Sequence, residues 1–535
     1  MMKLVTSLVT FWLVLNCVSC SFVVDPGPAV KATRGEIWPK PKVQSSTENY
    51  FAIDPVTFQF KVTGHTCDIL DKAIERYYGI VFSVANDVGS TETNAIGSRN
   101  LFAKQATLDD SNFFGFLDEV EVHLKEPCEE WPYFEMDESY RISLNKFEYK
   151  LQSSTIWGIL RALESFSQMV ISWSGMLRIN STLIMDRPRF PHRGLLVDTS
   201  RHFISLPILL QILDGMAYNK LNVFHWHIVD DQSFPYHSVK FPELSEKGAY
   251  HRSMIYSPED VQTVLEEARL RGIRVMPEFD TPGHTRSWGE SHPELLTPCF
   301  GKLGPIDPTK ESTYAFLSGL FQEVAGVFPD RYFHLGGDEV AFDCWQSNSD
   351  ITEFMDDNQI VDYGILQARF TRRVVDLVDR LNKSSLVWQE VYENADNLPD
   401  GTVVQVWTGD QKQLLKKITG DGLPALLSAC WYLDHLSWGG DWQKFYNCEP
   451  RAFPGTQDQK KLVMGGEACM WGEVVNDRNI LQRIFPRVSA VAEKLWSQRN
   501  VNDTVEAAAR LEEHSCRMNR RGIPAQPPNG PGYCL

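Results

Sequence analysis

Eight short apolar runs, each the length of a β-strand, follow His192 and restrict the fold more than any other feature. They are GLLVDTS, NVFHWHIVDD, RVMPEFD, YFHLGGDE, LVWQE, VVQVW, ALLSACWY and VMGGEACMWGE. Most of them are separated by segments with helical periodicity. Strands that are apolar throughout and alternate with helices predict a parallel sheet that is covered on its outer face. Eight such units in roughly 300 residues predict a (β/α)8 TIM barrel, with an open doubly wound sheet as the alternative.

Two of the intervening segments carry clear helix signals. In SPEDVQTVLEEARLRG, Ser257 can cap the helix, Pro258 suits its first turn and Gly272 can end it. Its apolar residues follow the spacing of one buried helix face: Val261, Val264, Leu265 and Ala268. A second segment places a longer apolar stripe on one face: Leu366, Phe370, Val374, Leu377, Val378 and Leu381.

The chain before the barrel mixes helical and strand periods. The stretches VEVHL (120–124) and YRISL (140–144) alternate apolar and polar residues, which predicts half-buried strands. TIWGILRALESFSQMV, beginning at Thr155, has a helical pattern. We therefore expect a small α+β domain over residues 21–186, closed by the proline-containing stretch DRPRFPHRG. The barrel domain, with a helical C-terminal extension, is expected over residues 187–535.

The N-terminus, MMKLVTSLVTFWLVLNCVSCSF, has the layout of a secretory signal peptide. We expect cleavage near Cys20, so that residues 1–20 are removed, with an uncleaved membrane anchor as the alternative. The apolar run is short for spanning a bilayer, and no later segment is long and apolar enough to do so. Three N-x-S/T sequons agree with the secretory route, at Asn180, Asn382 and Asn502.

Passage through the secretory pathway permits disulfides. Loss of Cys17 and Cys20 with the signal peptide leaves nine of the eleven cysteines, so at least one thiol is free. The pairs that enclose plausible loops are Cys67–Cys128, Cys299–Cys344 and Cys516–Cys534. Sequence alone does not fix this connectivity, and three cysteines stay unassigned: Cys430, Cys448 and Cys469.

The formal charge argues against two classes of partner. The chain carries 52 Lys and Arg against 69 Asp and Glu, a net charge of −17. Nucleic acids and anionic membrane surfaces attract basic proteins, so we expect neither as a partner.

Acidic and aromatic residues gather at or just past the C-terminal ends of the apolar runs. They are Asp198, Arg201, Asp230, Asp280, Glu339, Trp388, Trp407, Tyr432, Trp471 and Glu473. Barrels carry their chemistry on that face, which favours the barrel over the open sheet. Tryptophan rings pack on the flat C–H faces of sugars, while carboxylates and Arg bind hydroxyls, so a neutral polyhydroxylated ligand is predicted. For any single tryptophan, core packing is the alternative.

Asp338 and Glu339 stand side by side in HLGGDEVAF, behind Gly336 and Gly337. Two neighbouring carboxylates disfavour both being charged, so one can hold a proton while the other is ionised. Glycoside hydrolysis needs such a proton for the leaving oxygen. A strand would point the two side chains to opposite faces, so we expect it to end or bend here, which the glycines permit. A solvated acidic loop is the alternative.

Five motifs together resemble glycoside hydrolase family twenty, and within it the lysosomal-type β-N-acetylhexosaminidase subunits: HRGLLVDTSRHF, NVFHWHIVDDQSFPY, EFDTPGHTRSW, HLGGDEV and GGEACMWGE. The resemblance covers nearly the whole chain after the predicted signal peptide. It implies a retaining exo-glycosidase that removes terminal β-linked N-acetylglucosamine or N-acetylgalactosamine without a cofactor. In the implied mechanism, the carbonyl oxygen of the substrate's own 2-acetamido group attacks the anomeric carbon and gives an oxazolinium intermediate. A homodimer, in lysosomes or outside the cell, is also implied.

The resemblance assigns catalytic roles to the adjacent carboxylates. Glu339 would be the general acid and later the base, while Asp338 would stay charged and orient the acetamido N–H. Asp230 and His284 would orient the site around Glu339, with Asp280 behind the histidine.

It also assigns substrate contacts. Arg201 would hold sugar hydroxyls, Glu473 would bind another, and Tyr432 would hydrogen-bond the acetamido carbonyl oxygen. The pocket for the acetamido group would be walled by Trp388, Trp407 and Trp471. Structural ion pairs are the alternative roles for Arg201 and Asp338.

One position bears on the charge of the substrate. In the family, α-type subunits carry Asn-Arg after WYL and accept negatively charged sugars, whereas β-type subunits carry an Asp. This chain has Asp434 followed by His435, which resembles the β-type and implies neutral sugars. A partly protonated His435 could relax that preference at acidic pH.

Two other functions compete with a glycosidase. His225 and His227 in HWH share one face of a strand, a spacing that metal sites use, which would suit a metal-dependent amidohydrolase. The other rival is a carbohydrate-binding protein without turnover. Further metal ligands are not evident at the strand ends, so we expect no metal.

Overall fold

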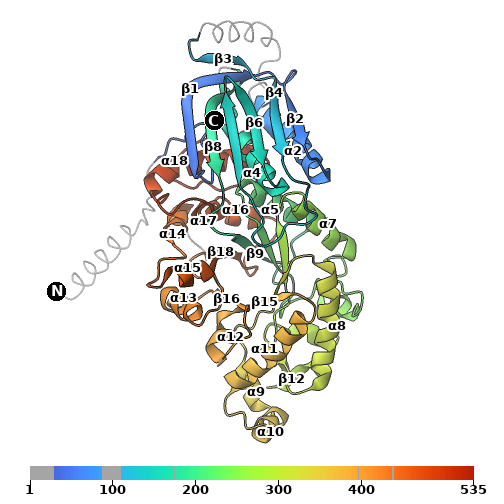
Figure 1. The fold of residues 1–535 in the computed structure, drawn as a ribbon. Coiled ribbons are helices and arrows are strands. Elements are labelled where there is room, and N and C mark those ends of the chain that lie inside the picture. The colour runs from blue at the N-terminus through green and yellow to red at the C-terminus, as the bar shows by residue number, and fades with distance from the viewer. Residues whose placement is uncertain (1–28, 87–109, 174, 396, 436–438, 535) are drawn as a thin grey trace, which may run out of the picture.

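The structure is a computed structural model that describes residues 29–86, 110–173, 175–395, 397–435 and 439–534 (Figure 1). The predicted signal peptide lies outside the described residues. An eight-stranded mixed sheet forms the N-terminal part, in the order β2-β4-β6-β5-β8-β1-β3, with β7 paired to β8. Its strands are β1 (Val43–Ile53), β2 (Gln59–Gly64), β3 (Phe113–Phe116), β4 (Glu119–Leu124), β5 (Tyr140–Asn145), β6 (Glu148–Ser153), β7 (Ile171–Trp173) and β8 (Met176–Asp186). Two helices, α2 (Asp68–Asn86) and α4 (Ile156–Met169), pack together beside it, so this part has an α+β architecture.

The second part is a closed barrel of eight parallel strands in the order β10-β11-β14-β15-β16-β17-β18-β9. Its strands are β9 (His192–Asp198), β10 (Val223–His227), β11 (Arg274–Glu278), β14 (Tyr332–His334), β15 (Ser384–Trp388), β16 (Val403–Val406), β17 (Ala425–Leu427) and β18 (Val463–Met470). Six of them fall within one of the eight apolar runs, while β9 and β15 each overlap their run and begin two residues before it. The predicted TIM barrel is therefore confirmed, and the open doubly wound sheet is not what this sequence forms.

Helices surround the barrel, which lies below the mixed sheet in Figure 1. They are α5 (Leu206–Tyr218), α6 (Glu243–Gly248), α7 (Pro258–Arg269), α8 (Glu311–Val327), α9 (Phe342–Ser347), α10 (Ser349–Asp357), α11 (Tyr363–Asp379), α12 (Gln389–Asn394), α13 (Gln411–Gly420), α14 (Trp442–Asn447), α15 (Gln457–Leu462), α16 (Ile480–Ile484), α17 (Arg487–Trp496) and α18 (Thr504–Arg520). Short 3-10 turns lie at η1 (Arg286–Glu290), η2 (Pro293–Leu295) and η3 (Gly439–Asp441), and a hairpin of β12 (Leu296–Cys299) and β13 (Lys302–Ile306) precedes α8.

Local signals in the sequence set the ends of α7. The Ser257 hydroxyl accepts from the backbone N–H of Asp260, and the Asp260 side chain accepts from the Ser257 backbone, which forms a capping box. The helix ends at Arg269, and Gly272 lies beyond it with φ +66°. On α11 four residues of the expected stripe are buried (Leu366, Phe370, Val374 and Val378) and Leu377 is half-buried, but the helix ends before Leu381.

The inside of the barrel is built in layers. Seven apolar side chains fill the layer nearest the N-terminal ends of the strands: Val223, Met276, Tyr332, Leu386, Val403, Leu426 and Met464. Because residues two positions apart share one face of a strand, the next inward residues follow at i+2. Five of these are almost fully buried and mostly polar: His225, Glu278, His334, Trp388 and Gln405.

The two parts share buried contacts. Trp38, from the N-terminal segment, belongs to the barrel's core cluster and donates its indole N–H to the Ser489 carbonyl at 2.9 Å. Glu138 accepts from Arg161 of α4 at 2.9 Å and from Arg193 of β9 at 2.6 Å. The barrel's core thus includes residues that precede the mixed sheet in sequence.

Within the described part of the chain, four disulfides join Cys67–Cys128, Cys299–Cys344, Cys430–Cys448 and Cys516–Cys534. Three have the pairing expected from the sequence, and the fourth joins two cysteines that sequence left unassigned. Cys469 is buried and unpaired. Among the sequons, Asn382 and Asn502 are exposed and Asn180 is half-buried on β8, and their glycosylation stays a prediction. Of the described helices, none is both long enough and apolar enough to cross a membrane.

Candidate active site

All eight barrel strands deliver predicted site residues to one end of the barrel. The contributions by strand are Arg201 after β9, Asp230 after β10, Asp280 and His284 after β11, Asp338 and Glu339 after β14, Trp388 at the end of β15, Trp407 after β16, Tyr432 and Asp434 after β17, and Trp471 and Glu473 after β18. The parallel strands therefore bring together residues that are far apart in the sequence.

The backbone that carries Asp338 and Glu339 is irregular. Strand β14 ends at His334, and the residues that follow include Gly336, Gly337 and Glu339 at φ +69°, +99° and +51°. A positive φ is uncommon for a glutamate and costs about 1 kcal/mol or more, so the surrounding structure must hold it. As a result the two carboxylates differ in environment: the Asp338 side chain is 12% exposed and the Glu339 side chain 60%.

His284 lies between these carboxylates and Asp230. Its Nδ1 is 3.1 Å from Asp230 Oδ1, and its Nε2 is 3.7 Å from Asp338 Oδ2 and 3.8 Å from Glu339 Oε2. Burial alone would lower the pKa of His284, but the carboxylates of Asp338, Asp280 and Asp230 outweigh it and raise that pKa to about 11. The imidazole is therefore a cation that faces both carboxylates of the pair.

Asp280 lies against the glycines rather than only behind the histidine. It accepts a hydrogen bond from the Gly337 backbone N–H at 2.8 Å. Burial first, and then the charge of Asp338, raises the pKa of Asp280 well above its ordinary value. Asp280 therefore favours its neutral, protonated form beside Asp338. Asp338 Oδ1 is buried without a hydrogen-bond partner among the described residues.

Arg201 is held in a fork of acceptors. Its guanidinium lies 3.0 Å from Asp198 Oδ2, 2.9 Å from Asp230 Oδ2 and 3.1 Å from Gln232 Oε1. It also lies over the Trp471 ring, 5.1 Å from its centroid. The ion-pair role that sequence left open for Arg201 is therefore present, at a position that also borders the aromatic residues.

Four aromatic side chains form one cluster, with Leu196 and Cys469 beneath them. Trp388 and Trp471 have ring centroids 6.0 Å apart, and Trp407 stacks on Tyr432 with centroids also 6.0 Å apart. Burial raises the pKa of the Tyr432 phenol, so its O–H remains a donor. The cluster offers apolar ring faces beside a hydrogen-bond donor.

Asp434 follows the tyrosine on a loop that the Cys430–Cys448 disulfide closes. Burial raises the pKa of Asp434, and the nearby Glu473 adds to this effect. Asp434 Oδ1 is buried without a hydrogen-bond partner among the described residues, and the following His435 is exposed. A polar atom placed in this way is suited to a ligand hydroxyl.

Three carboxylates of the site were missed by the sequence analysis. Glu278 accepts from the Trp388 indole N–H at 2.9 Å, Glu390 accepts from the Trp407 indole N–H at 2.9 Å, and Glu467 is fully buried against His225. Glu278 and Glu467 lie within apolar strand runs, and an ionisable residue there is itself the signal, because burial demands a partner.

The two histidines of HWH are bound by carboxylates. His227 contacts Glu278 at 2.5 Å and Asp230 at 2.7 Å, so both of its ring nitrogens are engaged. His225 contacts Glu467 at 2.7 Å and Glu278 at 3.0 Å. Within the described residues, three groups lie close enough to hold a cation: His225–Glu278–His334, Asp230–Asp231–His284 and Asp280–His284–Asp338. None includes both HWH histidines, so the paired-ligand reading of that motif is not supported.

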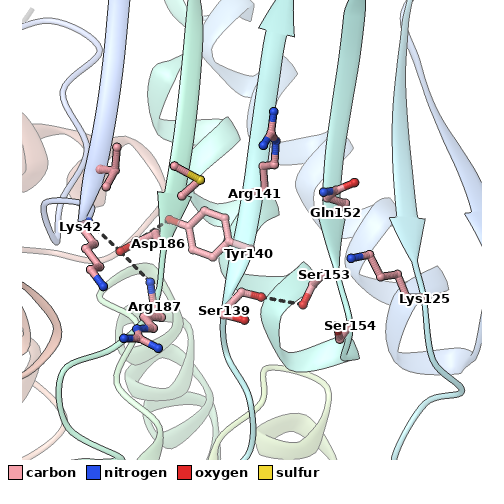
Figure 2. Close-up of a pocket in the computed structure, with 12 residues that line it drawn as sticks. Lys42, Lys125, Ser139, Tyr140, Arg141, Gln152, Ser153, Ser154, Asp186 and Arg187 are labelled. Carbon is pink, nitrogen blue, oxygen red and sulfur yellow. Dashed lines mark hydrogen bonds between the residues drawn. The ribbon is translucent and has the colours of Figure 1, made fainter.

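A separate hollow of about 390 Å³ lies on the mixed sheet, and Figure 2 shows its lining. Its charged residues are mostly basic: Lys42, Lys125, Arg141, Arg187 and Asp186. The Asp186 carboxylate already accepts from Tyr140 at 2.7 Å and from Trp496 at 3.0 Å. This hollow lacks a carboxylate pair and a tryptophan wall, so the barrel end is the candidate active site.

Comparison with known families agrees with this placement. A family model described as "Glycosyl hydrolase family 20, catalytic domain" matches residues 190–499. The chain belongs to glycosyl hydrolase family 20. A second model, "beta-acetyl hexosaminidase like", matches residues 37–169. The enzyme class of this family 20 chain is accordingly β-N-acetylhexosaminidase.

Relatives match over nearly full length. The beta-hexosaminidase subunit beta of Homo sapiens is 45% identical over 528 residues, which is 96% of this chain and 91% of that protein. The beta-hexosaminidase subunit alpha of Rattus norvegicus is 44% identical over 518 residues, 93% of this chain and 94% of that protein. The solved chitobiase of Flavobacterium johnsoniae superposes with a TM-score of 0.79 at 26% identity, covering 91% of this chain and 73% of that one.

Proposed function

We propose that this family 20 enzyme is a retaining exo-glycosidase that uses the substrate's own acetamido group as its nucleophile. The observation that carries the proposal is the unequal environment of the adjacent carboxylates. The buried Asp338 faces the His284 cation and keeps a free oxygen, whereas the Glu339 side chain is open to a ligand. An enzyme that supplied its own nucleophile would need a second carboxylate across the scissile bond rather than beside the acid.

In the proposed first step, Glu339 donates its proton to the glycosidic oxygen as the bond from that oxygen to the anomeric carbon breaks. The acetamido carbonyl oxygen attacks the same carbon and forms an oxazolinium ion, and Asp338 accepts the acetamido N–H. In the second step the Glu339 carboxylate takes a proton from water, which attacks the anomeric carbon and opens the ring. Two displacements at one carbon retain its configuration.

The remaining residues bind the terminal sugar in this proposal. Arg201, which two aspartates hold, donates to sugar hydroxyls. Asp434 and Glu473 accept from hydroxyls. The acetamido group occupies the aromatic cluster, where the Tyr432 O–H meets its carbonyl oxygen, and the walls are Trp388, Trp407 and Trp471.

Substrate and setting belong to the same proposal. The half-buried carboxylate of Asp434 disfavours anionic sugars, so we propose neutral N-acetylglucosamine and N-acetylgalactosamine ends. Four disulfides are typical of the secretory pathway, and we propose a lysosomal or extracellular site of action. We also propose a homodimer, which light scattering of the purified protein at micromolar concentration tests, since a monomeric mass would contradict it.

The test of the proposed function is release of the aryl alcohol from an aryl N-acetyl-β-glucosaminide between pH 4 and 7. The purified protein is assayed with and without a chelator, beside Glu339→Gln. We expect turnover that the chelator leaves unchanged and that the substitution lowers by about 10²-fold or more. Absence of turnover in the unaltered protein would favour a binding protein, and turnover lost only with the chelator would favour a metal-dependent hydrolase.

A further inference from the structure

A continuous line of buried histidine and carboxylate side chains crosses the inside of the barrel and reaches the proposed site. We call it the inner ionic chain, and its members in order are His192, Glu467, His225, Glu278, His227 and Asp230. All six are at most 1% exposed. They come from the ends and middles of strands β9, β18, β10 and β11, and from the loop after β10.

The deep half of the inner ionic chain lies below the aromatic cluster. His192 Nε2 is 2.6 Å from Glu467 Oε1, and Glu467 Oε2 is 2.7 Å from His225 Nδ1. His225 Nε2 is 3.0 Å from Glu278 Oε2, a close ionic contact without hydrogen-bond alignment.

The upper half leads into the site. Glu278 Oε2 is 2.5 Å from His227 Nδ1, and His227 Nε2 is 2.7 Å from Asp230 Oδ2. The other oxygen of Asp230 contacts His284, which faces Asp338 and Glu339. The line therefore ends at the cation between the two proposed catalytic groups.

Charges of opposite sign alternate from Glu467 to Asp230, whereas burial lowers the pKa of His192, which forms a neutral end of the line. Burial would raise the pKa of each carboxylate, but the neighbouring imidazoles outweigh it and lower the pKa of Glu467, Glu278 and Asp230. Burial would likewise lower the histidine pKa values, yet the carboxylates raise that of His225 to about 9 and that of His227 to about 10. A buried charge is tolerated only when it is paired, so each member depends on its neighbours.

Glu278 is the branch point. Its Oε2 holds His227, which in turn holds Asp230. Its Oε1 lies 2.9 Å from both the Trp388 indole nitrogen and His334 Nδ1. The Glu278 carboxylate thus orients Trp388 of the aromatic cluster directly. Through His227 it also orients Asp230, the aspartate that holds Arg201.

We infer that Glu278 is a positioning residue for the proposed reaction, fixing Trp388 and the His227–Asp230 pair together while touching no substrate itself. The inference rests on the proposed function. Glu467 supports it from one step further away, because it fixes His225 against Glu278. The charged or titratable groups that face this part of the chain are His192 of β9, His225 and His227 of β10, Asp280 after β11, His334 of β14 and Glu467 of β18, with Trp388 and Gln405 as neutral neighbours.

The first test is Glu278→Gln, which keeps the shape and removes the charge. Small misplacements of a site cost about 10²-fold, so we expect kcat/KM to fall by about 10- to 100-fold. His227 loses one of its two carboxylates, which lowers its pKa from about 10 toward its ordinary value. Its proton is then lost at lower pH, so the alkaline limb of the kcat/KM profile moves toward acid.

The matched control is Glu493→Gln. Glu493 is equally buried and ion-paired, with Arg510 at 2.7 Å and Tyr446 at 2.7 Å, but it lies on α17 outside the inner ionic chain. A folded Glu278→Gln protein with the kcat/KM and pH profile of this control would overturn the inference. Glu467→Gln is expected to move the same limb by a smaller amount.

A measurement on the unaltered protein covers the case in which the variants do not fold. In ring-¹⁵N histidine spectra between pH 5 and 8, we expect the rings of His225, His227 and His284 to stay doubly protonated. Rings that all titrate near the ordinary histidine value would overturn the inference. If the unaltered protein shows these charged rings but no turnover, the proposed function fails and the ionic chain stands.

Discussion

Asp280 occupies the space that a side chain on Gly336 would need. A β-carbon built on residue 336 would lie 1.7 Å from Asp280 Oδ1, and the backbone there has φ +69°. The glycine therefore does more than permit a turn. It lets the β14 loop close onto a buried carboxylic acid, and the next N–H, from Gly337, donates to that acid at 2.8 Å.

Gly336→Ala is expected to abolish turnover and to destabilise the fold. The clash forces Asp280 or the loop to move, and this displaces Asp338 and Glu339, so kcat/KM should fall by about 10²-fold or more. Unfolding in urea should show a loss of about 2–4 kcal/mol. Gly301→Ala is the control, because its φ is +73° but nothing lies within 4 Å of the added carbon. It should lose only about 1 kcal/mol and keep its activity. Equal effects of the two substitutions would contradict the steric argument.

The barrel was predictable because a parallel strand that is buried on both faces is apolar throughout, and such runs are visible in the sequence. The same holds for α7, where Ser257 and the stripe from Val261 to Ala268 fix both ends and the buried face. Leu381 was predicted to lie on the helix, but the helix ends before it. Apolar spacing alone does not show at which residue a helix ends.

The catalytic pair was predictable from local chemistry, whereas its support was not. Asp338 and Glu339 are adjacent and follow glycines, so one short stretch carries the signal. Glu278 and Glu467 are separated by 189 positions, and only closure of the barrel brings both against His225. The roles of these two glutamates depend on partners from other strands, and the residue pattern of a single strand does not show those partners.

Loss of the Cys430–Cys448 disulfide should weaken substrate binding. The bond closes a loop of sequence separation 18 that carries Tyr432 and Asp434. Replacing both cysteines with serine should cost about 3 kcal/mol of unfolding free energy, and a freer loop should raise KM about 3- to 10-fold. The control removes Cys516–Cys534, which has the same separation but lies at the C-terminus. That variant should lose similar stability with KM unchanged, and a rise in KM for both pairs would contradict a local role.

Asp434→Asn combined with His435→Arg should improve turnover of a substrate that carries a sulfate on its terminal sugar. The substitution removes a half-buried carboxylate and adds a fixed cation on the same loop. We expect the ratio of kcat/KM for the sulfated over the neutral aryl substrate to rise about tenfold or more, since 1.4 kcal/mol suffices for that factor. His435→Arg alone separates the added cation from the lost carboxylate. An unchanged ratio in the double variant would place the charge selectivity elsewhere.

Glu390 links the aromatic cluster to pH. It stands at the start of α12 and accepts the Trp407 indole N–H, with Nε1 2.9 Å from Oε2. Burial, with a smaller contribution from the charge of Asp338, raises the pKa of Glu390 from 4.5 to about 7. Near pH 5 the side chain is therefore neutral, and as the pH rises through 7 it becomes a half-buried anion.

This shift predicts a sign for stability. Between pH 4.5 and 7 the folded state keeps a proton on Glu390 that the unfolded state has lost, so raising the pH destabilises the fold. Glu390→Gln stays neutral and escapes that loss. We compare the unfolding free energy of the variant with that of the unaltered protein by urea unfolding at pH 5 and at pH 7.5. The difference in favour of the variant should be larger at pH 7.5 by roughly 1–2 kcal/mol. Glu393→Gln, at an exposed position of the same helix, should show little change with pH. If the stability difference between Glu390→Gln and the unaltered protein is the same at both pH values, Glu390 is ionised throughout this range. That result would contradict a neutral Glu390 carboxyl beside Trp407.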